Sequence, residues 1–457
     1  MNIVAHNHQS RELLSSKISR FLEEFHVGRI LQACNAYKVR GFSVKDVFQV
    51  AFENAFSSKS FFQKQRESST SIPFAKDTFY RFMNSSSINW RKFTLQLSSA
   101  VIQKIEPLTN EKRRNVLIID DSLFSRARAK KVELLAKVYD HVEHKYTKGF
   151  RMLTLGWSDG NSFLPLSQCL LSSAERENRL QEASASIDAR SNGGKLRKLA
   201  QTKATSVMLT LLKEAKDADI PAKYVLFDTW FCSPEAMLQI KNIGYDVVGM
   251  VKKGDKIHFR YNGRMQSAPT IFQAAKKRRG RSPYLLSVEA EAVKGEQAIP
   301  IKLVFVRNRN NRQDYLILVS TDVNLSEEEI IQTYGKRWNI EVFFKMCKSY
   351  LKLGKESRTM SYDAMTAHVS IVLARCMLLS LEQRRKIDKR SIGELFYVSC
   401  DELQDLQYMD ALIMVLKKLV SMITEKWLFL EKELNAMLDS FLENLPDLWH
   451  NCLNRCA

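Results

Sequence analysis

The sequence predicts an α/β fold in which a buried sheet lies between helical segments at the two ends of the chain. Two apolar runs of four or five residues end abruptly in acid, at Asp121 and at Asp228, and such runs are typical of fully buried strands. Helical periodicity covers residues 11–105 and returns after Gly354. Since 457 residues exceed what one core usually supports, we expect two or three domains.

The charge balance predicts a polyanionic partner. The chain has 70 Lys and Arg against 50 Asp and Glu, a formal net charge of +20, and its basic residues are spread along the whole length. Nucleic acid is the leading interpretation, with simple solubility or attraction to a membrane surface as the alternative. Hydrophobic residues make up 45% of the chain, which is enough for an ordinary globular core.

Other features favour a cytoplasmic protein. The first ten residues contain no basic segment followed by an apolar one, so no secretory signal is expected. The longest apolar segment, Ala364–Leu381, is interrupted by His368 and Arg375 and is predicted to be a core helix, not a membrane span. Neither the eight cysteines nor the eight histidines show the spacing of a zinc site, and the cysteines are expected to be reduced.

Residues 1–110 are predicted to form a helical domain. The sequence Ser43–Asp46 is a capping box that opens one helix. Another helix, Lys76–Asn84, mixes basic and aromatic residues. It is either a recognition helix that places Arg81 on DNA or part of a bundle whose core includes Phe79.

From Lys112 the pattern changes to strands and helices in the order β-β-β-α-β-α-β-α. Strands are expected at 115–121, 149–158, 163–171, 224–228 and 245–251, and helices at 199–217, after the Ser233-Pro234 cap, and at 326–348. The polar interval 173–198 is predicted to be a mobile loop, which either orders on a phosphate backbone or has no function. Alternating stretches between 252 and 324 predict extra strands, with a basic loop at Lys276–Arg281 that suits phosphates or is merely solvated.

The ionisable residues of the segment YGKRWNIEVFFKMCK are spaced to share one face of a helix. At about 100° per residue, four of them lie within about 60° of azimuth: Tyr334, Arg337, Glu341 and Lys348. Lys345 borders the same stripe, so one carboxylate is flanked by three cations and a phenol, an arrangement suited to polyphosphate. On geometry alone, a solvated charged face is the alternative.

This Y-x2-R-x3-E-x6-K pattern resembles the YREK signature of the Asp-Asp-Glu transposases of bacterial insertion sequences, the insertion-sequence-four family. In that family the glutamate completes a metal-binding carboxylate triad, so the resemblance implies catalytic and metal-binding roles for Asp121, Asp228 and Glu341. Asp120 competes with Asp121 for the first position. The family pattern of Asp followed by Ser or Thr favours Asp121, and alternation in a strand lets only one of the two face the metals.

Pattern and resemblance together predict a ribonuclease-H-like catalytic core at 111–385 with a β-rich insertion at about 252–324. In such a fold the strands at 115–121 and 224–228 are neighbours, and their acidic ends share metal. The resemblance implies that residues 1–110 form the DNA-binding domain. Residues 386–457 are expected to form a C-terminal helical region that offers a dimer surface or closes an intramolecular bundle.

The function that the resemblance implies is cut-and-paste transposition. Two Mg²⁺ ions about 3.5–4 Å apart, replaceable by Mn²⁺, support hydrolysis by water and then attack by the freed 3′-hydroxyl, commonly through a DNA hairpin. Arg337, Lys345 and Lys348 would bind DNA phosphates, and Tyr334 would hydrogen-bond the same backbone. Because the insertion lacks tryptophan, Trp338 is the candidate for stacking on a flipped base, with Tyr284, Phe272 and Tyr315 as substitutes.

The partners expected from the resemblance are double-stranded DNA, as transposon ends and as target, and a second copy of the chain, at the nucleoid in a bacterial cytoplasm without membrane contact. Two alternatives to a transposase remain open at this point. One is a tyrosine recombinase that uses Tyr334 as a covalent nucleophile, and the other is a non-catalytic DNA-binding protein descended from a transposase. Strand-end acids argue against the first rival, and the complete carboxylate set argues against the second.

Overall fold

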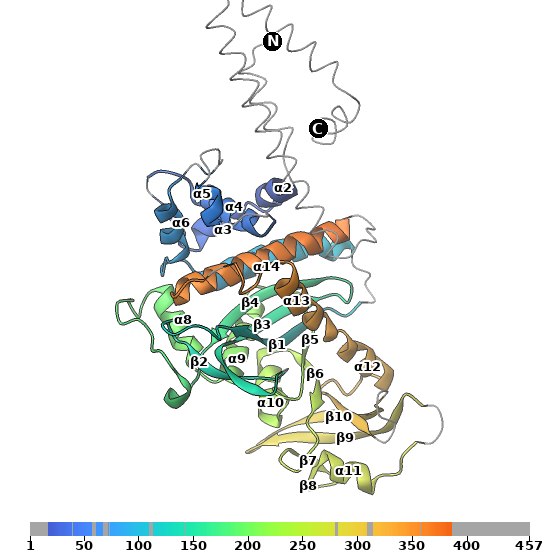
Figure 1. Cartoon of the computed structure of the whole chain (residues 1–457). Coiled ribbons are helices and arrows are strands. Elements are labelled where there is room, and N and C mark those ends of the chain that lie inside the picture. Colours follow the sequence, from blue (N-terminus) through green and yellow to red (C-terminus); the bar gives the residue numbers. More distant parts are fainter. Residues whose placement is uncertain are drawn as a thin grey trace, which may run out of the picture.

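The computed structural model describes residues 17–385 except 39, 57–60, 67–71, 73, 109–112, 142, 279–281, 309–313 and 357. The described strands form a single mixed sheet of 11 strands, with helices packed against it. Figure 1 shows the N-terminal helices and helix α14 (Tyr362–Arg385) as layers above the sheet, with the later strands extending away at the lower right. The prediction of a mixed α/β fold with flanking helices is confirmed.

The N-terminal region is helical, as predicted. Its elements are α2 (Lys17–Glu24), α3 (Val27–Ala33), α4 (Val44–Glu53), η1 (Asn54–Phe56), α5 (Phe61–Arg66), α6 (Lys76–Met83), α7 (Trp90–Ile105) and η2 (Glu106–Leu108). The Ser43 hydroxyl accepts from the Asp46 N–H at 3.1 Å, which caps α4. On α6, Lys76 and Arg81 are exposed while Phe79 packs against the core, so one helix combines a basic surface with a buried side.

The strands are β1 (Val116–Ser125), β2 (Ala136–Asp140), β3 (Lys145–Ser158), β4 (Phe163–Leu171), β5 (Tyr224–Phe227), β6 (Asp246–Val251), β7 (His258–Tyr261), β8 (Arg264–Ser267), β9 (Tyr284–Lys294), β10 (Gln297–Arg307) and β11 (Tyr315–Ser320). Their order in the sheet is β2-β3-β1-β5-β6-β11-β10-β9-β7-β8, with β4 paired to β3. Strands β1 and β5 run parallel with Val116 opposite Tyr224, which confirms that the two acid-bearing strands are neighbours.

The insertion strands are not a separate sheet. Strand β11 pairs antiparallel with β6, and β10, β9, β7 and β8 continue from there. The four extra strands expected from alternation are confirmed, whereas β8 and the short helix α11 (Ala268–Ala274) were not predicted. Both missed elements are short, and β8 has the mostly polar sequence RMQS, so neither shows a clear period in the sequence.

Two predicted boundaries between strands β4 and β6 are wrong. The interval expected to be a loop contains η3 (Arg176–Asn178) and the start of α8 (Asn192–Ala200), because the Ser191 hydroxyl caps the Gly194 N–H at 3.0 Å. The helix expected at 199–217 is therefore two helices, α8 and α9 (Ala204–Asp217). Helix α10 (Pro234–Ile243) begins as predicted, with Ser233 accepting from the Ala236 N–H.

The prediction of a single helix over 326–348 is also wrong. The chain forms α12 (Glu327–Gly335) and α13 (Trp338–Ser349), with a turn at Lys336 and Arg337 between them. Gly335 is a poor helix residue, and the Lys336 ammonium donates to the Arg114 carbonyl at 2.6 Å, so a tertiary contact holds the turn. The predicted capping box of Ser326 and Glu329 is confirmed at the start of α12.

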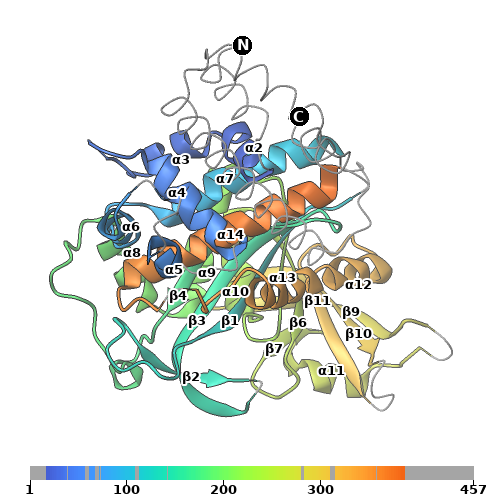
Figure 2. The same cartoon turned by 45° about the horizontal axis from the view of Figure 1, so that its top comes forward.

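Helix α14 lies in the core, as Figure 2 shows from a second side. Within the described part of the chain, Tyr362–Arg384 is long and apolar enough to cross a membrane, but its 18-residue apolar window is entirely buried in the fold. This agrees with the prediction of a core helix. The predicted C-terminal region, 386–457, and the first 16 residues lie outside the described residues.

Arg375 ties α14 to the N-terminal helices. Its guanidinium donates to the carbonyls of Phe52 at 2.8 Å and Ala51 at 2.6 Å, and to the Glu356 carboxylate at 2.7 Å. Asn54 and His368 contact the same carboxylate. The Gly354 N–H donates to His368 Nε2 at 3.2 Å, so the ring nitrogen facing Glu356 carries the proton of the neutral imidazole.

Removing Arg375 is expected to destabilise the whole chain. Arg375→Ala leaves the buried Glu356 carboxylate without its main cation, which costs about 3–5 kcal/mol in other proteins. The free energy of unfolding from urea titration measures this effect. The exposed neighbour Lys355→Ala is the matched control and should change stability by less than about 0.5 kcal/mol. Equal effects of the two substitutions would contradict a structural role for the Arg375 network.

Stability is also expected to fall in mild acid because of His368. Burial, opposed by Glu356 and reinforced by Arg375 and Arg126, lowers its pKa to about 4 from an ordinary 6.5. Below pH 6.5 His368 binds a proton in the unfolded chain, whereas in the folded chain it stays neutral until the pH approaches about 4. Folding stability therefore decreases as pH falls from 6.5 to about 4, by about 1.4 kcal/mol per pH unit at most.

The measurement for His368 is the urea midpoint as a function of pH. His368→Gln should flatten the dependence between about pH 6.5 and 4, while the exposed His258→Gln should not. Parallel curves for wild type and His368→Gln would show that another group causes the acid sensitivity.

Candidate active site

Parallel pairing of β1 with β5 brings the acidic residues together. Asp228 directly follows the last residue of β5, at its C-terminal end. Asp120 and Asp121 lie in the middle of β1, which does not end at the acid as the sequence suggested. The strand continues to Ser125 because β3 pairs with it along its whole length, from Val116–Ser158 to Ser125–Gly149.

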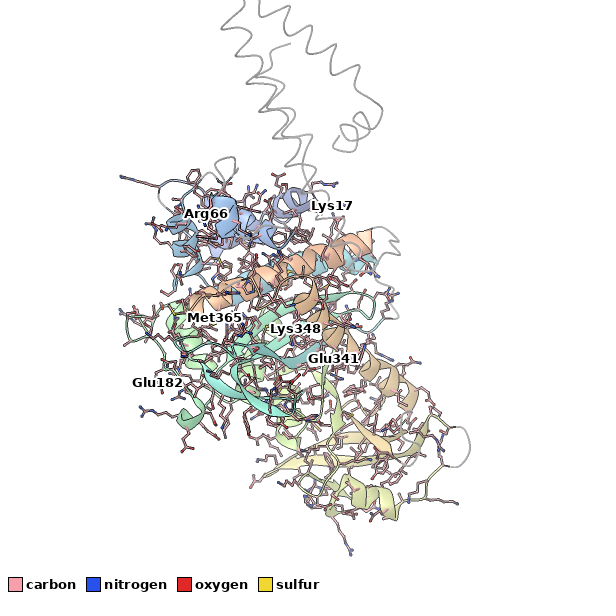
Figure 3. The ribbon with its side chains drawn as sticks, in the orientation of Figure 1. Lys17, Arg66, Glu182, Glu341, Lys348 and Met365 are labelled. Atoms are coloured by element: carbon pink, nitrogen blue, oxygen red, sulfur yellow. The ribbon has the colours of Figure 1, made fainter. Side chains whose placement is uncertain are left out.

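The two adjacent aspartates face opposite sides of the sheet. Asp120 accepts from Arg337 Nη1 at 3.3 Å, and Ser122, two residues along, accepts from the Lys348 ammonium at 2.6 Å. Helix α13 therefore covers the Asp120 side of β1, and Figure 3 shows Glu341 and Lys348 along this helix beside the strands. Asp121 instead pairs with Arg151 of β3.

Arg337 joins a residue of the sheet to a residue of the helix. The same Nη1 atom that contacts Asp120 contacts Glu341 at 3.1 Å. Glu341 lies in the first turn of α13 with its side chain 44% exposed, while Arg337 is 14% exposed. The arginine of the predicted signature thus bridges two carboxylates in the described structure.

The pKa values of both aspartates on β1 are raised. Burial, followed by the Asp228 charge, raises the pKa of Asp120 to about 7, and the Asp121 charge adds to the rise while Arg337 opposes it. Burial also raises the pKa of Asp121, although Arg151 opposes that shift. Both groups would be stabilised in their ionised form by additional positive charge at this place.

Tyr334 lies near the end of α12 and Lys348 near the end of α13. The Tyr334 hydroxyl is buried and has no hydrogen-bond partner among the described residues. Burial, together with the nearby Asp228 charge, raises its pKa to about 12 although Arg337 opposes the shift. Burial lowers the pKa of Lys348. Tyr334 is therefore a neutral donor that lacks an acceptor, and Lys348 is a partly buried cation.

Two exposed tryptophans border this region. Trp338, the predicted stacking residue, begins α13 and is 63% exposed. Trp230 is 60% exposed, two residues after Asp228, and the Arg151 guanidinium lies 5.0 Å from its ring centroid. Lys345 of α13 is exposed, with no contact to the acids among the described residues. Sequence reasoning missed Trp230 and Arg151; an aromatic between Asp228 and the Ser233-Pro234 cap was the available signal.

The donor set suits a hard divalent cation. The acids offer only carboxylate oxygens, which Mg²⁺ prefers, and the raised pKa of Asp120 is the shift that a bound cation would reverse. Among the described residues, no three His, Cys, Asp or Glu side chains are grouped closely enough to hold an ion together. Arg337 lies between Asp120 and Glu341, where it neutralises both, so the arrangement is an arginine-bridged acid cluster.

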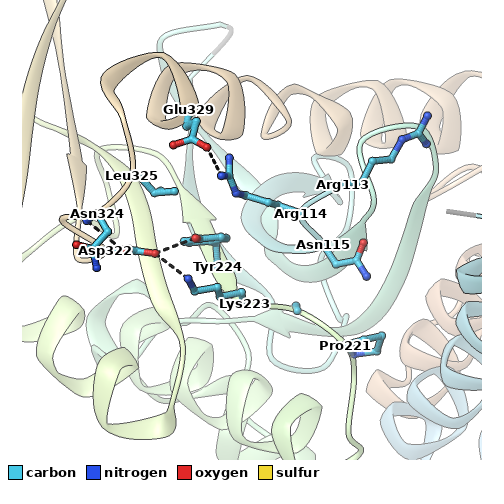
Figure 4. Close-up of a pocket in the computed structure, with 11 residues that line it drawn as sticks. Arg113, Arg114, Asn115, Pro221, Lys223, Tyr224, Asp322, Asn324, Leu325 and Glu329 are labelled. Atoms are coloured by element: carbon cyan, nitrogen blue, oxygen red, sulfur yellow. Dashed lines mark hydrogen bonds and ion pairs between the residues drawn. The ribbon is translucent and has the colours of Figure 1, made fainter. Parts of the chain in front are cut away.

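A separate cavity of about 550 Å³ lies at the opposite ends of β1 and β5 (Figure 4). Its cations are paired. Lys223 contacts Asp322 at 2.8 Å, and Arg114 contacts Glu329. The Tyr224 hydroxyl donates to Asp322 at 2.9 Å. The cavity lies away from the acid cluster. The charges of Lys223 and Arg114 are each balanced by a paired carboxylate.

Comparison with known proteins identifies the family. The family model described as "DDE superfamily endonuclease" matches residues 56–304, a range that includes Asp120, Asp121 and Asp228 and ends before Glu341. A search among curated proteins finds none that is similar. Since the match covers more than half of the 457 residues, the chain belongs to the DDE superfamily of endonucleases.

Proposed function

We propose that this endonuclease is the transposase of a bacterial insertion sequence, which binds the terminal inverted repeats of its element and cuts and joins DNA. The observation that carries the proposal is the arginine-bridged acid cluster, in which Arg337 contacts both Asp120 and Glu341 beside Asp228. Family membership implies DNA as substrate and a divalent metal ion as cofactor. The net charge of +20 supports a polyanionic substrate.

The core is proposed to be ribonuclease-H-like. Its support is the arrangement of the first strands, with β3 and β4 antiparallel next to β1, and β1, β5 and β6 parallel. Helix α13 packs on β1 and carries Glu341 in its first turn. In this arrangement one acid comes from a rigid helix and two come from adjacent strands, which limits how far the three can separate.

The proposed metal ligands are Asp228, Glu341 and one of the adjacent aspartates, for two Mg²⁺ ions that Mn²⁺ can replace. The resemblance to the YREK transposases supports Asp121. The contacts of Arg337 support Asp120, because they connect that carboxylate to Glu341, whereas Asp121 pairs with Arg151. Two bound ions would supply an activated water, charge neutralisation at phosphorus and stabilisation of the leaving 3′-oxygen.

The residues around the acids are proposed to hold DNA. With cations bound, Arg337 is released from neutralising the carboxylates and can donate to a phosphate, as can Lys348 and the exposed Lys345. Tyr334 has an unused hydroxyl donor for the same backbone. Its burial and raised pKa oppose a role as covalent nucleophile, so the tyrosine-recombinase reading gains no support.

Several finer steps remain part of the proposal. The resemblance supports hairpin formation by the freed 3′-hydroxyl, its hydrolysis and strand transfer into target DNA, with Trp338 stacking on a displaced base. It also supports binding of the element ends by the N-terminal helices and a homodimer in the DNA complex. The exposed Lys76 and Arg81 of α6 suit phosphate contacts in that binding.

Cleavage is expected to require both metal and Glu341. Purified protein incubated with its element end and Mg²⁺ should nick the strand, and a chelator or Glu341→Gln should abolish nicking while gel-shift binding persists. Glu328→Gln is the matched control, because Glu328 is an exposed acid in the first turn of α12. Nicking that survives chelation or Glu341→Gln would refute metal-dependent catalysis by this cluster.

The two aspartates on β1 are expected to differ. Asp120→Asn should abolish nicking, since it removes the carboxylate that shares Arg337 with Glu341. Asp121→Asn should reduce nicking less, because Asp121 pairs with Arg151. Rates under single-turnover conditions decide between them. The reverse order would make Asp121 the ligand, as the resemblance implies.

Asp120→Asn is also expected to stabilise the metal-free protein. The substitution removes a buried negative charge close to Asp228, so the Tm should rise at neutral pH. Mg²⁺ should raise the Tm of the wild type by mass action and have little effect on the variant. Asp77→Asn, an exposed change on α6, is the control. A variant that responds to Mg²⁺ like the wild type would exclude Asp120 as a ligand.

A further inference from the structure

Thr154 lies directly opposite Asp120 in the sheet. The register of β1 against β3 pairs these two residues, and the register of β3 against β4 pairs Thr154 with Gln168. Opposed residues of antiparallel strands point to the same face of a sheet, with Cβ atoms about 4.5–5.5 Å apart. The three side chains therefore form a row across three strands, on the face of β1 that contacts Arg337.

The two residues behind Asp120 in this row are buried polar side chains without partners. Thr154 is 0% exposed and Gln168 is 1% exposed. Among the described residues, the Thr154 hydroxyl and both polar atoms of the Gln168 amide have no hydrogen-bond partner. Burying a polar group without a partner destabilises the folded state, so most buried polar groups are paired. Two unpaired residues in a row that ends at an acid of the cluster point to a role at that acid.

The chemistry of the three groups fixes the direction of hydrogen bonding along the row. An ionised carboxylate only accepts, a hydroxyl donates one proton and also accepts, and an amide nitrogen only donates. The Thr154 hydroxyl would therefore donate to Asp120, and its oxygen would accept from the Gln168 nitrogen. Rotation about side-chain bonds is enough to bring these atoms together, since the Cβ atoms of opposed residues are close.

One oxygen of Asp120 depends on Arg337 in the described structure. Asp120 Oδ1 accepts from the Asp121 N–H at 2.8 Å, whereas Oδ2 lies 3.3 Å from Arg337 Nη1. The same Nη1 atom contacts Glu341, so cations held by these carboxylates would take over the charge that the guanidinium neutralises. A carboxylate that binds a metal needs a hydrogen-bond donor to keep its orientation. Thr154 is a buried donor on the neighbouring strand, directly opposite.

We propose that Thr154, supported by Gln168, is a positioning residue that holds the Asp120 carboxylate in its metal-binding orientation. This proposal rests on the proposed function and deepens it, because it requires Asp120 to be the ligand on β1. Thr154 and Gln168 act through Asp120 and touch neither the metal nor the DNA.

The test measures the apparent Kd for Mg²⁺ from the rise of the Tm with Mg²⁺ concentration. Thr154→Val keeps the branched shape of the side chain and removes the hydroxyl. It should raise the apparent Kd about ten-fold, whereas Thr154→Ser should stay within about two-fold of the wild type. Without Mg²⁺, Thr154→Val should be at least as stable as the wild type, because it removes an unpaired buried hydroxyl.

A second variant and a matched control come from β4. Gln168→Met removes the amide and should raise the apparent Kd about three-fold, since it weakens the support of Thr154. Ser167→Ala is the control. Ser167 is also buried with an unpaired hydroxyl, but it lies opposite Leu155, on the other face of the sheet. Its removal should leave the apparent Kd unchanged.

An unchanged apparent Kd in Thr154→Val, or an equal rise in Ser167→Ala, overturns the proposal. Lower metal-free stability of Thr154→Val with an unchanged apparent Kd shows a purely structural residue. Should Thr154→Val not fold, the value for Gln168→Met decides by the same criterion. A wild type that nicks its element end and responds to Mg²⁺ no better than the variants refutes the positioning role alone. A wild type that neither nicks nor responds to Mg²⁺ refutes the proposed function and this proposal with it.

Discussion

The parallel pairing of β1 with β5 is the constraint on which the candidate site depends. With Val116 opposite Tyr224, the acids in the middle of β1 lie beside Asp228, which follows the end of β5. This concentrates negative charge in a partly buried place, and the raised pKa of Asp120 is its consequence. The site is therefore an electrostatically unfavourable arrangement that nearby cations must offset.

Two arginines supply that compensation, one on each side of the sheet. Arg151 of β3 pairs with Asp121, and Arg337, from the turn between α12 and α13, bridges Asp120 and Glu341. The break between α12 and α13 leaves Arg337 in a turn from which its guanidinium reaches Asp120 on β1, while Glu341 lies in the first turn of α13. Each arginine marks one face of β1, so two adjacent aspartates have different environments and different expected roles.

The same sheet connects the site to distant parts of the chain. The insertion strands extend it through the β6–β11 pairing, and β4, buried along its whole length, packs against α7 and α14. Arg375 then joins α14 to the carbonyls of Ala51 and Phe52 in the N-terminal region. A contact between DNA and the N-terminal helices would consequently act on a body that shares one core with the acids.

Local sequence determined which segments are strands and helices wherever period, burial or capping was strong. Strand β4 was predicted at its observed bounds, the Ser326–Glu329 capping box starts α12, and the two acid-bearing strands are neighbours as expected. The residue types of the site, carboxylates with arginine, lysine and tyrosine at set spacing, were likewise visible in the chain. The strand period, the cap and the residue types depend on interactions within a few residues, whereas the neighbouring position of the acid-bearing strands was expected from the fold that the element order and the resemblance predict.

Tertiary structure alone decided how those residues meet. The turn at Lys336 and Arg337 depends on a contact with the carbonyl of Arg114, more than 200 residues away. The pairing of Asp121 with Arg151 depends on the register of β1 against β3, and the exposure of Trp230 depends on what packs around its neighbours. Such contacts are set by long-range packing, so no local period or motif in the sequence could have predicted which aspartate faces α13.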